Sequence, residues 1–376
     1  MEIYLDHNAT TPIDPEVLEE MRPFLESCFG NPSSIHRFGQ AAKRGLDTAR
    51  ERVAALIGAE PEEIVFTSGG TEANNQAIFG VAHQTNRRRF VTSQVEHQAV
   101  LNPFEVLASQ GKDAVQVPVD ADGRVQQGAL TDAVTDDCAL VSIMTANNDV
   151  GTVQPISDIV EIVRQRGAVF HTDAVQAVGK LPIDVSKTAV DLLSFSSHKI
   201  YGPKGAGALY IRRGISLSPR LFGGHQESRR RAGTENVPAT VGFGKACELA
   251  AGRLEADAAR MAALRDKLQT ALLDRIPRCR VFGENKRLPG TLNMGFEGIE
   301  GDTAMMALDL QGIAISTGSA CMTESRTLSH VLTAMGVGPL LAKGSIRFSL
   351  GRKNTEAEID EVIEAVTAVV ARLRQI

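Results

Sequence analysis

Short apolar runs alternate with segments of helical periodicity along the chain up to residue 211. Runs rich in Val, Leu and Phe are typical of buried strands, and apolar positions spaced three and four apart are typical of helices. The pattern predicts strands over 63–67, 90–93, 114–118, 140–145, 168–172, 192–196 and 207–211, and helices that include 73–83, 99–110 and 156–166. Such alternation indicates an α/β fold in which a mostly parallel seven-stranded sheet is sandwiched by helices.

The pattern changes after residue 240. A long helical segment over 241–275 is followed by expected strands over 280–282, 291–296, 313–316 and 345–349 and by a closing helix from Glu356. This order is typical of a smaller α+β unit, and Ile3-Tyr4-Leu5 is expected to add a strand to one of the two units. At 376 residues the chain is long enough for two domains. We expect a large domain over 12–255 and a small domain made of 1–11 and 256–376.

Polar clusters follow several of the predicted strands directly. Functional groups in a parallel sheet gather at the carboxyl ends of its strands, so these clusters are expected to share one edge. They are Thr67-Ser68-Gly69-Gly70-Thr71, Glu96-His97, Asn147-Asn148, Asp173 and Ser196-Ser197-His198-Lys199.

Lys199 is the most informative residue of this edge. It comes after a buried strand and two serines, and Gly202-Pro203-Lys204-Gly205 follows it as a glycine-rich turn. An amine presented there can form a Schiff base with an aldehyde cofactor, and pyridoxal 5′-phosphate (PLP) is the usual partner. Gly70 and Thr71 begin a predicted helix, where backbone N–H groups and a hydroxyl can bind a phosphate. A plain helix cap by Thr71 is the alternative.

Three further residues fit a ring-shaped cofactor, each with a structural alternative. Asp173 can accept a hydrogen bond from a pyridine nitrogen, or it can cap a helix. Gln176 lies three residues on and can contact the phenolic oxygen of the ring. His97 can stack on the ring and move protons, or it can be a satisfied structural histidine.

Arg347 and Cys321 are candidates for substrate chemistry. Arg347 interrupts the apolar strand Ser345–Ser349, where a guanidinium can bind a carboxylate in bidentate fashion or form an internal salt bridge. Cys321 lies in a small, polar, loop-like segment, where a thiol can act as a nucleophile, whereas the other four cysteines lie in or beside apolar or helical segments. A cysteine without a chemical role is the alternative.

Composition and charge bear on which kinds of partner and which compartment are expected. The formal net charge of −5 argues against nucleic acid as the main partner, although Arg87-Arg88-Arg89 and Arg229-Arg230-Arg231 are local basic clusters. Five cysteines without a CxxC pair fit a reducing compartment and no metal site. No signal segment and no apolar run of membrane-spanning length is recognised, so we expect a cytoplasmic protein without a membrane partner.

Several motifs together resemble the NifS/IscS-type cysteine desulfurases, in the class V aminotransferase group of fold-type I PLP enzymes. The lysine motif points to PLP, and its combination with the Gly-Ser-Ala-Cys loop is specific for desulfurases. The resemblance runs nearly end to end and rests on Tyr4–Pro12, Asn31–Ser34, Gly70–Glu72, Glu96-His97, Asn147–Gly151, His171–Gln176, Ser197–Lys199, Arg231–Thr234 and Ser319–Cys321.

The resemblance implies a role for each matched residue. Lys199 forms the Schiff base, Asp173 pairs with the pyridine nitrogen, and Gln176 contacts the phenolic oxygen. Asn148 and Arg347 bind the substrate carboxylate. The implied cofactor-binding set is Gly70, Thr71, His97, Asn148, Asp173, Gln176, Ser196, His198, Lys199 and Thr234, with Thr234 reaching the cofactor of the other subunit of a homodimer.

The implied reaction converts L-cysteine to L-alanine. Lys199, His97 and Cys321 are the catalytic residues, and Cys321 receives the sulfur as a persulfide. The sulfur then passes to an acceptor protein, for iron–sulfur cluster assembly or for thiolation. Another class V PLP enzyme, such as a selenocysteine lyase or a small amino-acid aminotransferase, is the alternative.

The chain departs from the common pattern of these enzymes in two places. His7-Asn8 stands where an aromatic and a small residue are usual, and Glu324 and Arg326 follow Cys321 where small residues are usual. These departures bear on partner choice and loop behaviour.

Overall fold

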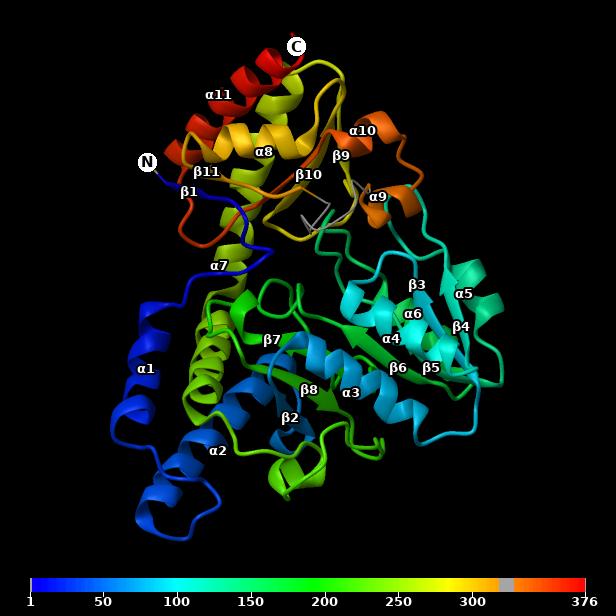
Figure 1. The fold of residues 1–376 in the computed structure, drawn as a ribbon, viewed down its shortest axis with the longest axis vertical. Helices are drawn as coiled ribbons and strands as arrows, with labels where there is room; N and C mark the ends of the chain where they lie inside the picture. Colours follow the sequence, from blue (N-terminus) through cyan, green and yellow to red (C-terminus); the bar gives the residue numbers. More distant parts are fainter. Residues whose placement is uncertain (1, 318–327, 376) are drawn as a thin grey trace.

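A seven-stranded sheet forms the larger part of the protein, whose computed structural model describes residues 2–317 and 328–375 (Figure 1). The strand order is β2-β8-β7-β6-β5-β3-β4. β8 runs antiparallel to both of its neighbours and the remaining pairs are parallel. The strands are β2 (Ile64–Thr67), β3 (Arg89–Ser93), β4 (Asp113–Val117), β5 (Cys138–Ser142), β6 (Val169–Asp173), β7 (Leu192–Ser196) and β8 (Gly207–Ile211). The predicted seven-stranded, mostly parallel sheet is confirmed.

Helices cover both faces of this sheet because successive strand residues point to opposite sides. Val65 packs with α3 (Gly70–Ala82) and α4 (Gln98–Ser109) in one apolar cluster. Phe66, its neighbour, packs in a second cluster with the helices of the other face. Those helices are α1 (Pro15–Glu26), α2 (Arg37–Ile57), α5 (Gln127–Ala133), α6 (Ile156–Arg164) and the first half of α7 (Val237–Arg275).

A separate apolar cluster holds together the smaller part. β12-β10-β9 form an antiparallel sheet, and β1 pairs in parallel with β11. Helices α8 (Gly301–Asp309) and α11 (Glu356–Leu373) pack on them together with Leu264, Leu268 and Leu272 from the second half of α7. Helices α9 (His330–Ala334) and α10 (Pro339–Lys343) instead contribute to the apolar cluster that contains Phe66. The elements are β1 (Ile3–Tyr4), β9 (Cys279–Phe282), β10 (Thr291–Phe296), α8 (Gly301–Asp309), β11 (Ile313–Ala314), α9 (His330–Ala334), α10 (Pro339–Lys343), β12 (Ser345–Ser349) and α11 (Glu356–Leu373).

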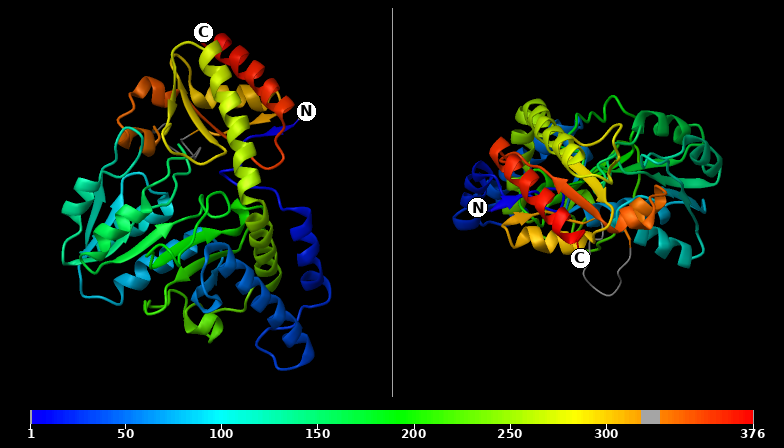
Figure 2. Two further views of the ribbon diagram at one scale, coloured as in Figure 1. Left: turned by 180° about the vertical axis from the view of Figure 1, so that it is seen from behind. Right: turned by 90° about the horizontal axis from the view of Figure 1, so that it is seen from above.

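Helix α7 joins the two parts. It passes from one to the other with α1 and α2 beside its first half and α11 beside its second half (Figure 2). It begins four residues before the predicted start at 241, because the Asn236 side chain accepts a hydrogen bond from the Ala239 N–H and Pro238 fits the first turn. None of the helices in the described ranges has both the length and the apolar character that crossing a membrane requires.

The N-terminal residues return to the large sheet after β1. We call residues 6–11 the N-terminal strap. Asp6 forms a bridge with Ser349 of β12, and Thr11 donates both its backbone N–H and its hydroxyl to the His198 carbonyl beyond β7. The strap therefore lies between the carboxyl ends of the large sheet and the smaller part.

Candidate active site

Lys199 closes a short 3₁₀ turn, η2 (Ser197–Lys199), that begins where β7 ends. Its Nζ donates to the carbonyl oxygens of Asn8 and Ala9 in the strap, at 2.5 and 2.6 Å. Burial lowers the pKa of Lys199 to about 8, the charge of Arg347 adds to this, and Asp6 and Asp173 oppose it. An amine with this pKa is partly neutral near pH 7, as a Schiff-base lysine must be.

Backbone and hydroxyl donors form a cradle beside Lys199. Gly70 is the first residue of α3, after Gly69 as the helix cap. Gly207 on β8 lies so close that an added Cβ would be 2.7 Å from Gly69 Cα, so the two backbones need glycine here. Ser196 is buried and makes only a long 3.5 Å contact to the Ala206 carbonyl. These free donors at a helix N-terminus fit a phosphate, and the cap is Gly69 rather than Thr71.

His198 faces the same cradle. Its Nδ1 lies 3.1 Å from the Thr10 hydroxyl of the strap. Burial lowers the pKa of His198 to about 4, and the Lys199 charge adds to this, so the ring is neutral at pH 7. A neutral ring with Nδ1 engaged has Nε2 left for one further hydrogen bond.

Asp173 is buried at the end of β6. Its Oδ2 accepts from Asn74 Nδ2 at 2.6 Å, and its Oδ1 accepts from the Val175 N–H at 2.9 Å. The second bond is the turn-capping role that the sequence left open. A carboxylate has lone pairs beyond these two contacts, so Asp173 can also accept from a ring N–H.

His171 fixes the strand that carries Asp173. Its two ring nitrogens lie 2.8 Å from Ser142 Oγ on β5 and 2.9 Å from Ser194 Oγ on β7. Full burial lowers the pKa of His171 to about 3, so the ring remains neutral. Three neighbouring strands are thereby tied together two residues before Asp173.

Gln176 and Lys180 lie on the turn after Asp173. Gln176 Nε2 donates to the Asn8 carbonyl at 2.9 Å, and Lys180 Nζ donates to Gln176 Oε1 at 2.8 Å. The predicted contact of Gln176 with a cofactor oxygen stays a prediction. Lys180 was not singled out from the sequence, where Val178-Gly179-Lys180 resembles an ordinary surface turn.

His97 caps helix α4 as its first flanking residue. Its Nδ1 accepts the Ala99 N–H at 3.0 Å, which leaves the proton of the neutral ring on Nε2. Partial burial lowers the pKa of His97, and Asp173 opposes this. The structural alternative therefore holds in part, while the exposed side chain keeps one nitrogen for chemistry.

Arg347 lies in the middle of β12 with its side chain almost fully buried. Its Nη2 pairs with Asp6 Oδ1 at 2.8 Å, and its Nη1 donates to the Asn148 carbonyl at 3.1 Å. The internal salt bridge left open by the sequence is thus present. Arg347 Nε has no partner among the described residues, so the guanidinium keeps a donor for another group.

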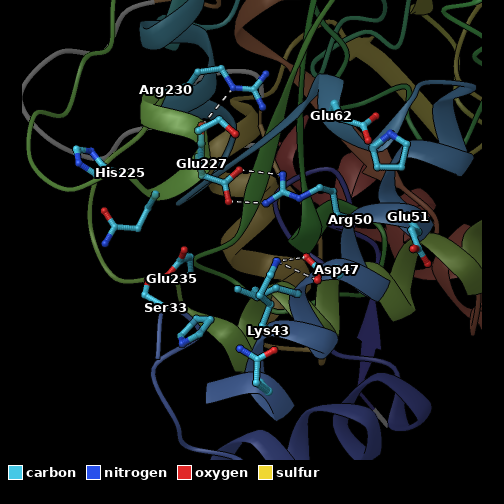
Figure 3. Close-up of a pocket in the computed structure, with 16 residues that line it drawn as sticks. Ser33, Lys43, Asp47, Arg50, Glu51, Glu62, His225, Glu227, Arg230 and Glu235 are labelled. Carbon is cyan, nitrogen blue, oxygen red and sulfur yellow. Dashed lines mark hydrogen bonds and ion pairs between the residues drawn. The ribbon is translucent and has the colours of Figure 1, made fainter. Parts of the chain in front are cut away.

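Thr234 and the second arginine cluster lie on the loop that precedes α7, and this loop borders a cavity of about 790 Å³ against α2 (Figure 3). The loop is anchored: Arg50 and Glu227 form a bidentate pair at 2.6 and 2.9 Å, and Arg231 pairs with Glu72 at 2.8 Å. Thr234 itself is exposed beside a smaller cavity that Ser68 and Arg231 also line. No contact within this chain tests its predicted role.

Cys321 lies outside the described residues. Of the other cysteines, burial raises the pKa of Cys138 to about 11 and that of Cys247 well above its usual value, and it also raises that of Cys279. Raised thiol pKa values disfavour the thiolate, so these three are poor nucleophiles.

Two contacts fix the chain just after residues 318–327. Ser329 Oγ donates to Asp149 Oδ2 at 2.6 Å, and His330 Nε2 lies 3.0 Å from the Glu96 carbonyl. Helix α9 therefore begins next to the segments that carry Asn148 and His97.

Comparisons with known proteins show the family of this chain. The family model described as aminotransferase class V matches residues 3–362. A cysteine desulfurase of Trichormus azollae is 50% identical over 374 residues, covering 99% of this chain and 94% of that protein. The cysteine desulfurase IscS of Methanosarcina thermophila is 48% identical over 375 residues, covering 99% and 93%. A solved structure of a NifS-like protein has a TM-score of 0.94 at 40% identity, covering 99% of this chain and all of that one.

Proposed function

The chain belongs to the class V aminotransferase family and, within it, to the cysteine desulfurases, and from this premise we propose that it converts L-cysteine to L-alanine and transfers the sulfur to Cys321. The observation that carries the proposal is a partly neutral lysine amine between a phosphate-type cradle and a buried carboxylate. Few sites other than a PLP site need these three groups together.

PLP fits the residues present. Gly70, Thr71, Ser196 and His198 would hold its phosphate, Lys199 would hold its aldehyde carbon, and Asp173 would hold its pyridine nitrogen. His97, Gln176 and Asn148 would contact its ring. When bound, PLP supplies an electron sink for negative charge that develops on the substrate α-carbon. Asp173 supports this by its negative charge, since it keeps a proton on the nitrogen that it contacts.

Lys199 and Arg347 act on the substrate. Arg347 and Asn148 bind the cysteine carboxylate, and this orients the α-hydrogen toward Lys199 Nζ. Lys199 removes that proton as a general base, because its lowered pKa makes the neutral amine available. The strap carbonyls of Asn8 and Ala9 then receive the N–H groups of the freed amine.

Cys321 completes the reaction. Its thiolate attacks the substrate sulfur, so that an S–S bond forms as the C–S bond breaks and the electron pair of that bond stays with the carbon skeleton. That skeleton is protonated and released as alanine. His97 Nδ1 accepts the Ala99 N–H, so Nε2 carries the ring proton, and His97 would act on the transferred sulfur as a hydrogen-bond donor.

The protein acts as a homodimer with shared sites. Exposed apolar side chains near the arginine-cluster cavity support a covered surface, since Phe29, Ile35 and Phe222 are 73%, 93% and 83% exposed. Thr234 reaches the phosphate of the partner's cofactor from this face. The active chain is divided into a large domain, 12–255, and a small domain, 1–11 with 256–376. It works in the cytoplasm and passes its sulfur to an acceptor protein of iron–sulfur assembly or thiolation.

Product analysis tests the proposal. Purified protein given L-cysteine and a reductant yields alanine and sulfide in equal amounts. Cys321→Ser retains the PLP absorbance band and yields no sulfide, whereas the matched variant Cys28→Ser behaves as wild type. A keto acid product would instead indicate an aminotransferase, and activity with selenocysteine alone would indicate a selenocysteine lyase. Full sulfide release by Cys321→Ser would contradict the persulfide step.

A further inference from the structure

Lys180 places a largely buried ammonium group between two side-chain amides. Its Nζ lies 2.8 Å from Gln176 Oε1 and 3.2 Å from Asn8 Oδ1. No carboxylate of the described residues lies within 4.0 Å of this nitrogen. A buried cation without a counter-ion is costly, so its position calls for a reason beyond packing.

Burial lowers the pKa of Lys180 to about 7, and both the ammonium and the neutral amine have N–H donors for two acceptors. The two amide atoms that face Lys180 must therefore be oxygens, and each amide must turn its NH₂ group the opposite way. An amide that lacks such a partner can rotate by a half-turn at little cost, which exchanges its donor and its acceptor. Lys180 removes that freedom from Gln176 and Asn8 together.

The far ends of both amides agree with this orientation. Gln176 Nε2 donates to the Asn8 carbonyl at 2.9 Å. Asn8 Nδ2 donates to the Asn148 carbonyl at 3.1 Å and to Thr291 Oγ1 at 3.0 Å. A carbonyl can only accept, so donor-only and acceptor-only groups at opposite ends fix each amide in one state.

The local backbone directs Lys180 to this place. The turn after Asp173 contains two helix-like hydrogen bonds, from the Val178 N–H to the Ala174 carbonyl and from the Leu181 N–H to the Ala177 carbonyl. Gln176 and Lys180 therefore lie on one side of this turn. Gly179 then takes a φ of 73°, and an added Cβ there would lie 2.6 Å from Ile200 Cγ2. The backbone just before Lys180 therefore packs closely against Ile200, the residue that follows Lys199.

We propose that Lys180 is a positioning residue that holds the Gln176 amide with its second N–H toward the phenolic oxygen of PLP and holds Asn8 against the Asn148 loop. The inference rests on the proposed function, because it assigns a direction to the cofactor contact of Gln176. Lys180 touches neither substrate nor cofactor, and it acts through the two amides.

The charge of Lys180 also affects the protonation of the nearby groups. The charged and titratable groups around Lys180 are Lys199 on η2, Arg347 on β12 and His7 on the strap. Removing the ammonium takes away a cation and also one fixed N–H donor to the phenolic oxygen. Both changes favour the protonated form of the Lys199–PLP linkage, so its titration moves to higher pH.

The test compares Lys180→Met, Lys180→Arg, Gln176→Leu and the double variant Lys180→Met/Gln176→Leu. Each is measured for the pH midpoint of the PLP absorbance band and, separately, for kcat and KM with L-cysteine. Lys180→Met moves the midpoint upward by about 0.5–1 pH unit and lowers kcat roughly 10-fold. Lys180→Arg restores both values in large part, since it keeps donor and charge. Lys187→Met, an exposed lysine of the following loop, behaves as wild type.

Non-additivity is the decisive result. If Lys180 acts through Gln176, Lys180→Met changes kcat much less in the Gln176→Leu background than in wild type. Fully additive effects, or an unshifted band in Lys180→Met, would overturn the inference. Failure of the proposed function is distinguishable, because the wild-type protein would then show no PLP band or would form no alanine and sulfide from L-cysteine. A melting temperature for each variant separates misfolding from mispositioning.

Discussion

The two sides of the candidate site hold Lys199 in different ways. On the large-sheet side, the polar groups near Lys199 are side chains at strand ends: Asp173 ends β6, Ser196 ends β7, and His198 follows β7. On the strap side, main-chain carbonyls of Asn8 and Ala9 receive the lysine, and Asp6 holds Arg347. The large-sheet side therefore depends on the types of its side chains. The strap side depends on the position of its backbone, because its hydrogen bonds to Lys199 come from main-chain carbonyls.

The strap side of the site is built from both ends of the chain. The strap and β12 are far apart in sequence, yet Asp6 pairs with Arg347 and Asn8 N–H donates to Ser349 Oγ at 2.9 Å. The substrate side of the site therefore exists only when the N-terminal strap is bound to the smaller part. Variants on the two sides should change different kinetic constants.

Lys199→Ala has the largest expected effect. Loss of the amine removes both the covalent link to PLP and the general base, so we expect activity to fall about 10³-fold or more. Sulfide release and the absorbance spectrum measure the two losses. Lys187→Ala removes an exposed lysine and serves as the matched control. Near-normal turnover by Lys199→Ala would contradict the assignment of Lys199 as the Schiff-base lysine and the general base.

Asp173→Asn tests the large-sheet side with the next largest effect. The amide keeps the size of the side chain and loses the negative charge that, under the proposed function, keeps the pyridine nitrogen of PLP protonated. We expect kcat to fall roughly 10²-fold while KM for L-cysteine changes little. A variant that raised KM instead would mean that Asp173 positions substrate, as the strap side does.

Asp6→Asn tests the strap side. Arg347 loses its charged partner and is held less firmly, so we expect KM for L-cysteine to rise about 10-fold with a smaller change in kcat. Glu2→Gln, an exposed acid at the start of the chain, is the control. A wild-type KM with a reduced kcat in Asp6→Asn would contradict the expectation that the strap side acts on substrate binding.

The smallest expected effect is a shift in the pH dependence of PLP uptake between the wild-type protein and Asp6→Asn. The neutral amine of Lys199 attacks the aldehyde, so the rate of PLP uptake by cofactor-stripped protein should rise with pH around a midpoint near the lowered pKa of about 8. Asp6 raises the pKa of Lys199, so Asp6→Asn should move this midpoint to lower pH. Stopped-flow absorbance measures it, and a shift to higher pH would contradict the assignment.

Much of the large-sheet side could be predicted from the sequence. Polar clusters that stop a buried apolar strand are easily recognised, and the parallel topology brings Asp173, Ser196 and Lys199 to one edge. The antiparallel direction of β8 could not be predicted, because a short apolar run has the same pattern in either direction. The capping contacts of His97 and Asp173 show that the structural and chemical roles of one residue can coexist.

The strap side was largely missed, and the reason is physical. Its contacts to Lys199 are carbonyl oxygens, which every residue carries and which no residue type reveals. Asp6 and Thr10 matter through partners more than 180 residues away. Lys180 is a third case, since its role depends on two amides that meet it only after folding. The unusual His7-Asn8 pair was the one available signal, because it departs from the family pattern at this place.

The central claim is that sulfur passes from L-cysteine to Cys321, and peptide mass analysis tests it most directly. Protein mixed with one equivalent of L-cysteine, without reductant, should carry one extra sulfur atom on the peptide that contains Cys321, and an equal amount of alanine should form. The modification should be absent in Cys321→Ser and in Lys199→Ala. Alanine formed in full with the extra sulfur on another cysteine, or on none, would contradict the account.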